Sequence, residues 1–284
     1  MISDVFDYER PASLVHAIAA LAQHGDVARV IAGGHSLLPM MKLRLAAPEV
    51  LIDINALPEL QGIEIGADEV LIGAATTHAT LEHHAALAAA LPLIPLVAHQ
   101  IADPTVRNRG TLGGSLAHAD PSADWPAVML ALGARIDVAG RNGARSIAIE
   151  DFFQGMFETA LEPGEVIVAV RIARRRGTRV AYRKFRHPAS GYAVVGVAVV
   201  LDVEQGRCTG GRIAITGFAD RAFLATRAQA LLTGYDGAPS ATERLLDAAF
   251  DAAAPLEDRF ADADYRIQLG RTMLRRALND ALVA

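Results

Sequence analysis

Two short segments of this sequence have the residue types of a phosphate-binding loop. Each joins a glycine pair to a hydroxyl residue: Ala32-Gly33-Gly34-His35-Ser36 and Thr111-Leu112-Gly113-Gly114-Ser115. Paired glycines let consecutive backbone N–H groups converge on one point, where a diphosphate offers several acceptor oxygens. Either segment alone is explained equally well as a tight turn, because glycine pairs are common in turns. If the two segments meet in the fold, they would suit a single diphosphate.

Other phosphate-binding and catalytic patterns are missing from the sequence. It contains no G-x-G-x-x-G and no Gly-Lys pair, so neither a Rossmann loop nor a Walker loop is expected. His78, Glu82 and His83 are close together, but the two histidines are not at the i,i+4 spacing of a helical metal site. No nucleophile and base can be paired either. We therefore expect no metal site and assign no catalytic residue.

The composition is that of a globular protein with a substantial core. About half of the residues are apolar, and the net charge of -5 gives no reason to expect binding to nucleic acid or to an anionic membrane. Cys208 is the only cysteine, so the chain can form no internal disulfide. It also cannot hold an iron–sulfur cluster by itself, because such clusters normally take four protein ligands.

Two features of the sequence predict a cytoplasmic protein. The first 25 residues are acidic where a signal peptide would be basic. The longest apolar stretch, residues 85–98, is too short to span a bilayer and contains Pro92 and Pro95. We read it as a buried helix with a break and expect no membrane-spanning segment.

Predicted helices and strands flank the glycine segments and must position them. Apolar spacing predicts a helix over 13–23, and strands are expected at 28–32, 49–54 and 70–74. The first glycine segment directly follows one of these strands. Asp124-Trp125-Pro126 opens a helix to about residue 132, with Asp124 as a plausible N-cap. A hairpin around Asn142-Gly143 and a strand at 165–172 complete this half.

The pattern of predicted elements changes near Arg174-Arg175-Arg176-Gly177, which we take as a domain boundary. Beyond it come strands at 180–186, 192–203 and 207–217, and then three helical patterns. Strands followed by helices favour an α+β fold over a doubly wound α/β fold. We therefore expect domains over 1–176 and 177–284.

Longer strings around these features carry a family resemblance. AGGHSLLPMMKLRL (32–45) and VRNRGTLGGSLAHADPSADWPAVMLAL (106–132) resemble the two FAD motifs of the FAD-binding medium subunits of molybdenum hydroxylases, of the carbon monoxide dehydrogenase and xanthine dehydrogenase type. YRKFRHPASGYAVVGV (182–197) is similar to the start of that family's C-terminal domain. The resemblance covers essentially the whole chain, with both motifs in the family's order and spacing.

The resemblance implies a fold and a set of FAD contacts. It implies a two-subdomain FAD-binding domain, like those of vanillyl-alcohol oxidase and other PCMH-type proteins, followed by a smaller domain with a three-stranded antiparallel sheet and a helical bundle. FAD would be bound non-covalently, with both glycine segments donating to its phosphates. Tyr192 could pack near the isoalloxazine, although a buried strand aromatic is the better interpretation. Ser115 stands where many relatives carry Asp or Asn. The FAD-contacting residues implied outside the glycine segments are Asp124, Leu161 and Lys184, the last beside the flavin ring.

The resemblance also implies partners, because this chain cannot ligate a cluster. A [2Fe–2S] cluster would belong to an iron–sulfur small subunit, and a molybdenum–pterin cofactor to a molybdopterin-binding large subunit, in a dimer of heterotrimers. The chain would relay electrons from the cluster to an external acceptor such as NAD, a quinone or oxygen. Two alternatives stay open at this point: a stand-alone PCMH-type FAD oxidase acting on a small alcohol or amine, and a non-redox module that binds another phosphate ligand.

Overall fold

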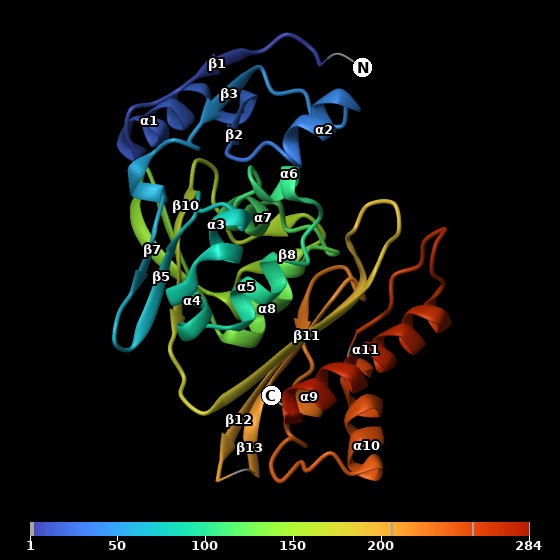
Figure 1. Ribbon diagram of the computed structural model, residues 1–284. Coiled ribbons are helices and arrows are strands. Elements are labelled where there is room, and N and C mark those ends of the chain that lie inside the picture. The colour runs from blue at the N-terminus through green and yellow to red at the C-terminus, as the bar shows by residue number, and fades with distance from the viewer. Residues whose placement is uncertain (1–2, 206, 252, 284) are drawn as a thin grey trace.

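A computed structural model describes residues 3–205, 207–251 and 253–283, and it mixes helices and sheets throughout (Figure 1). The N-terminal part is a small parallel sheet with strand order β1-β3-β2. Its strands are β1 (Asp7–Glu9), β2 (Ala28–Ile31) and β3 (Val50–Asp53), and its helices are α1 (Leu14–His24) and α2 (Leu37–Lys42). Short 3₁₀ turns lie at Gly25–Val27 and Pro58–Leu60.

The second part is an antiparallel five-stranded sheet with order β4-β5-β10-β6-β7. Its strands are β4 (Ile63–Ile65), β5 (Glu69–Gly73), β6 (Arg135–Gly140), β7 (Gly143–Ala148) and β10 (Val166–Ala173). The predicted hairpin is the β6–β7 turn, where Gly140 pairs with Gly143. A 3₁₀ turn at Ile149–Asp151 and a small hairpin, β8 (Phe153–Gly155) with β9 (Glu158–Thr159), precede β10.

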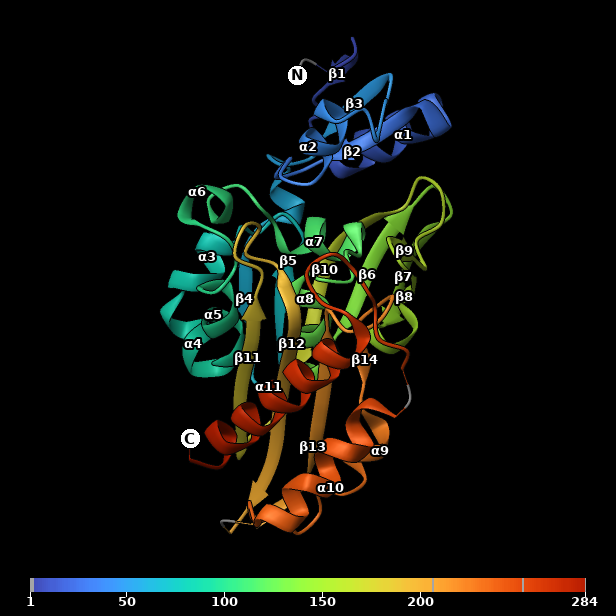
Figure 2. The same ribbon diagram turned by 90° about the vertical axis from the view of Figure 1, so that its right-hand side faces the viewer.

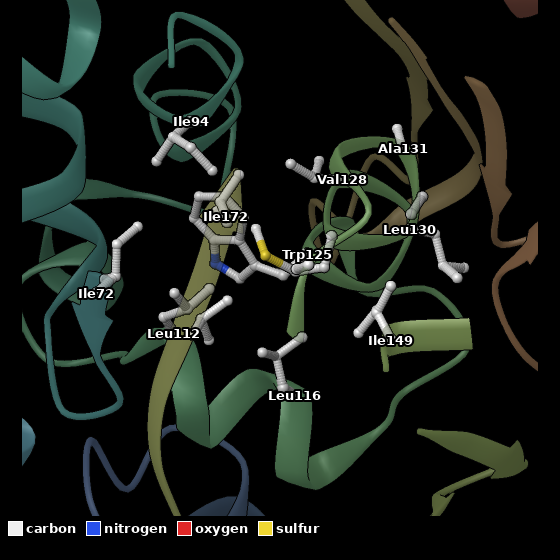
Figure 3. Packing of buried hydrophobic residues seen from close by; sticks show 14 of the residues in the cluster. Ile72, Ile94, Leu112, Leu116, Trp125, Val128, Leu130, Ala131, Ile149 and Ile172 are labelled. Carbon is white, nitrogen blue, oxygen red and sulfur yellow. The ribbon is translucent and has the colours of Figure 1, made fainter. Parts of the chain in front are cut away.

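Helices pack against this sheet around Trp125, which is fully buried (Figure 3). They are α3 (His78–His83), α4 (Ala85–Ala90), α5 (Leu93–Ala98), α6 (Pro104–Arg107), α7 (Leu112–His118) and α8 (Asp124–Leu132). The apolar stretch 85–98 is broken between α4 and α5, where Pro92 lacks the N–H that would continue the helix. Figure 3 shows the indole among Ile94, Leu112 and Ile172, so α5, α7 and β10 share one core.

The C-terminal part is an antiparallel sheet covered on both faces. Its long strands are β11 (Thr178–Arg186), β12 (Ala193–Glu204) and β13 (Arg207–Thr216), followed by α9 (Thr226–Gln229), α10 (Pro239–Phe250) and α11 (Ala263–Val283). One face packs against α8 and the other against α11, which crosses β11 and β12 (Figure 2). Arg266 of α11 donates to the carbonyl oxygens of Val194 and Gly217, both at 2.6 Å, and so ties this helix to the sheet.

The structure corrects two expectations about local structure. The sheet of the C-terminal part has four strands rather than three, because β14 (Phe223–Leu224) pairs with β13. Two residues are too few to give a periodic pattern in the sequence. Asp124 is the first residue of α8 and not its N-cap; Ala123 occupies the cap position.

None of the helices in the described ranges has both the length and the apolar composition needed to cross a bilayer.

Candidate functional site

A cavity of about 1050 Å³ lies between the N-terminal sheet and the rest of the molecule. Its walls include the segment after β2, the start and end of α7, residues 161–167 and the turn before β12. Figure 2 shows α7 beneath the N-terminal sheet, which places both glycine segments at the junction. This volume is slightly above the range of about 300–1,000 Å³ that is usual for ligand pockets. The cavity is therefore large enough for a dinucleotide-sized ligand.

The first glycine segment presents free backbone donors to this cavity. β2 ends at Ile31, α2 begins at Leu37, and the residues between them line the wall. Within the described part of the chain, the N–H groups of residues 33–36 have no hydrogen-bond acceptor. Gly34 has φ +74°, a conformation that L side chains rarely adopt, and it turns the chain here. This arrangement fits a ligand with anionic oxygens.

The first glycine segment packs on the two residues that immediately precede the second segment. A Cβ on Gly33 would lie 2.2 Å from the carbonyl oxygen of Arg109 and 2.8 Å from Cα of Gly110. Such distances leave no room for a side chain, so Gly33 allows backbone to pack directly on backbone. The prediction that the segments lie together is therefore what the structure shows.

The second segment differs from the prediction in its hydrogen bonds. It forms the first turn of α7, and the N–H groups of residues 112–115 are already used by protein acceptors. Leu112 N–H donates to the Thr76 carbonyl (3.1 Å), and Gly113 N–H to the Ala74 carbonyl (2.8 Å). Gly114 N–H donates to the Thr111 hydroxyl (3.1 Å), and Ser115 N–H is likewise taken, by the Thr111 carbonyl (3.1 Å). The structure does not support free backbone donors at residues 112–115, whose exposed parts are the Gly114 and Ser115 surfaces.

Not every residue of the predicted FAD-contacting set lines the cavity. Leu112 is fully buried in the core around Trp125, and Lys184 lies behind the wall. The other predicted residues do line it: Ala32, Gly33, Gly34, His35, Ser36, Thr111, Gly113, Gly114, Ser115, Asp124 and Leu161.

Asp124 and Lys184 form an ion pair of 2.9 Å in which both side chains are nearly inaccessible. Tyr182 donates to the other carboxylate oxygen of Asp124, and Lys184 also donates to the Gly191 carbonyl at 3.1 Å. Burial raises the pKa of Asp124 and lowers the pKa of Lys184, and the attraction between the two charges opposes both shifts. The pair joins α8 to the turn at residues 190–192. The lysine charge is thus balanced by Asp124, and a role for Lys184 beside a flavin ring stays a prediction.

Tyr192 is not a buried strand residue, as the sequence interpretation preferred. It precedes β12, is 40% exposed and lines the cavity together with Ser190 and Gly191. Lys42 and Arg44, which follow the first glycine segment, are exposed. Among the described residues, no group of three or more His, Cys, Asp or Glu side chains could hold a metal ion.

Sequence reasoning missed several residues of the cavity wall. Phe157 is 54% exposed, and its ring centroid lies 5.1 Å from that of His118. Its φ of +56° is uncommon for a residue with a side chain, and nothing in the sequence indicated it. His78 also lines the wall, although the sequence had suggested it only as a weak metal candidate. The His78 ring accepts a hydrogen bond from the indole of Trp125, which lies 47 positions away in the sequence, so no local pattern reveals this contact.

Comparison with known proteins places the chain in a family. The family model described as "FAD binding domain in molybdopterin dehydrogenase" matches residues 4–174, and "CO dehydrogenase flavoprotein C-terminal domain" matches residues 180–281. The carbon monoxide dehydrogenase medium chain of Hydrogenophaga pseudoflava is 42% identical over 282 residues, which cover 99% of this chain and 98% of that one. This chain belongs to the flavoprotein subunits of the molybdenum hydroxylases.

Solved structures agree with this membership. A chain in the structure of a carbon monoxide dehydrogenase from Hydrogenophaga pseudoflava, which lacks the Mo-pyranopterin moiety of the molybdenum cofactor, matches this chain with a TM-score of 0.96 and 43% identity, over 100% of this chain and 99% of that one. Quinoline 2-oxidoreductase from Pseudomonas putida 86 matches with a TM-score of 0.93 and 36% identity over the same shares. The family predicted from the glycine strings is therefore confirmed.

The residues of the cavity fit the FAD of this flavoprotein family. The N–H groups of residues 33–36 are donors without acceptors at its wall, and Gly33 leaves no room for a Cβ that would separate the two segments. Both features suit a diphosphate held close to the backbone. The stand-alone oxidase and the phosphate-binding module are correspondingly less well supported.

Proposed function

We propose that this chain binds one FAD non-covalently in the 1050 Å³ cavity and relays electrons between a partner subunit and an external acceptor. The observation that carries the proposal is the row of four free N–H groups at residues 33–36, beside the close contact of the two glycine segments. When bound, FAD supplies redox chemistry that no side chain possesses. The chain's own part is to bind, orient and shield it.

Individual residues are assigned to this task as part of the proposal. The N–H groups of 33–36 and the Ser36 hydroxyl would hold the diphosphate. Thr111 and Gly113 would keep the second segment in place, since their hydrogen bonds are internal. Leu112 would act by packing, and Asp124 with Lys184 by fixing the turn at 190–192. The cofactor-facing set we propose is Ala32, Gly33, Gly34, His35, Ser36, Gly114, Ser115, Asp124 and Leu161.

The proposed partners are those that the family implies, and the cysteine content agrees with them. Cys208 is the only cysteine and is buried in β13, where its thiol donates to the Gly210 carbonyl. We assign a [2Fe–2S] cluster to an iron–sulfur small subunit, because this chain lacks the cysteines to hold one, and the molybdenum–pterin cofactor to a large subunit that hydroxylates the substrate. The proposed assembly is a dimer of such heterotrimers. The proposed domain boundary lies at 176/177, between β10 and β11, and the cytoplasmic location stays a prediction.

The proposal is tested with the full chain and with the reconstituted complex. The isolated chain should bind FAD stoichiometrically, and acid precipitation should release the flavin into the supernatant because it is not covalently attached. The bound flavin should be reduced by substrate only when the small and large subunits are present. Turnover of a small alcohol or amine by the chain alone would favour an oxidase. A colourless protein that does not bind added FAD would overturn the proposal.

A further inference from the structure

His78 stands at the cavity wall with one side of its imidazole fixed. The residue is 5% exposed and is the first residue of α3. It lines the cavity close to the second glycine segment. Trp125, which is fully buried, donates from its indole Nε1 to Nδ1 of His78 at 3.2 Å. An indole N–H is only a donor, so Nδ1 must be the acceptor and carries no proton. The neutral ring therefore has its proton on Nε2.

That second nitrogen has no partner within the protein. Among the described residues, Nε2 makes no hydrogen bond; the only one that the ring forms is the one from Trp125 to Nδ1. Every fully inaccessible side-chain nitrogen or oxygen in the same part of the chain does have a partner. Nε2 is therefore not sealed off, and the space that His78 lines is the cavity. A nearly buried N–H donor without an acceptor is unusual in a native protein and calls for a ligand.

The neighbours of Nε2 place this donor beside the free N–H groups of the first segment. A Cβ on Gly110 would lie 2.8 Å from Nε2, so a glycine is needed there to leave this edge of the ring uncovered. Gly110 in turn contacts Gly33, where the free donors begin. Burial, with smaller contributions from His35 and Arg107, lowers the pKa of His78 to about 4. The imidazole is thus a neutral donor at neutral pH.

We infer that Nε2–H of His78 donates a hydrogen bond to an oxygen of the diphosphate–ribityl segment of FAD. His78 is then a cofactor-binding residue whose tautomer is set by Trp125. The inference rests on the proposed FAD function and adds a donor outside both glycine segments. It also gives Gly110 a role, since any side chain there would collide with the donating nitrogen.

Substitution of His78 tests the hydrogen bond directly. In the full chain stripped of flavin, His78→Phe should weaken FAD binding on the order of tenfold, as expected for one hydrogen bond to a charged or strongly polar acceptor. His78→Gln keeps an N–H donor of similar reach and should recover most of the affinity. His118→Gln, at another histidine of the wall, is the matched control and should bind FAD more like the wild type than His78→Phe does. Affinities for ADP and FMN separate the two oxygen sources: a loss with ADP assigns the diphosphate, and a loss with FMN alone the ribityl chain.

A spectroscopic measurement on the wild type removes any dependence on folding of the variants. With ¹⁵N-labelled histidine, His78 should show the neutral Nε2–H tautomer, and saturation with FAD should shift its Nε2 and proton resonances. Unchanged resonances, or wild-type affinity in folded His78→Phe, would overturn the inference and leave the proposed function standing. Failure of the wild-type chain to bind FAD would remove both.

Discussion

Gly33 packs directly on the carbonyl group of Arg109, so closely that a Cβ would lie 2.2 Å from the carbonyl oxygen. The contact joins the strand–loop–helix unit β2–α2 to the segment that begins α7. Both segments line the cavity, and the N–H groups of residues 33–36 are free while those of residues 112–115 are used internally. The second segment therefore acts mainly as a structural support that holds the first segment in position.

Replacing Gly33 by alanine should weaken FAD binding by about tenfold or more, because the added methyl group must push two backbone segments apart. Flavin fluorescence titration of the apo chain measures the effect. Gly210→Ala is the control: Gly210 lies in β13, and its nearest contact to an added Cβ is at 3.9 Å. Equal affinity in the two variants would mean that the spacing of the glycine segments does not matter for binding.

Replacing Lys184 by methionine should destabilise the protein by about 3–5 kcal/mol, because the Asp124 carboxylate is left buried without its cation. Chemical denaturation measures the loss. In the same background, Asp124→Asn should restore part of the stability. The more accessible pair of Arg175 and Asp202 is the control, and Arg175→Met should cost about 0–1 kcal/mol. A small effect of Lys184→Met would show that the pair is not buried as described.

The stability of the apo chain should depend on pH through His78. Its pKa is about 4 in the folded chain and 6.5 in the unfolded reference, so the unfolded chain binds more protons between these values. The contribution is fully present above pH 6.5 and is lost progressively as the pH falls toward 4, by about 3 kcal/mol. Comparing denaturation of the wild type and His78→Gln isolates this part. Parallel pH profiles for the two proteins would contradict the burial of a neutral imidazole.

The sequence predicted the parts of the fold that follow from local patterns. The run of β-branched residues at 193–201 indicated a buried strand, and the structure shows why it does not alternate: α8 covers one face of β12 and α11 the other. Pro92 likewise indicated the break between α4 and α5. The glycine pairs predicted the two segments of the cavity wall.

The remaining features depend on partners far apart in the chain. The N–H groups of Leu112 and Gly113 are taken by carbonyl groups of Thr76 and Ala74, which no pattern around residue 112 reveals. Asp124 looked like an N-cap because capping and ion pairing both favour an aspartate. Its carboxylate is instead used by Tyr182 and Lys184, some sixty positions away. Tyr192 lies before its strand, where a local pattern could not separate a wall residue from a core residue.

The most direct test is an experimental structure of the full chain with bound FAD. The account predicts the diphosphate in the cavity, within hydrogen-bond distance of N–H groups in residues 33–36 and beside Gly114 and Ser115. A diphosphate found elsewhere, or one that leaves those N–H groups without a partner, would contradict it.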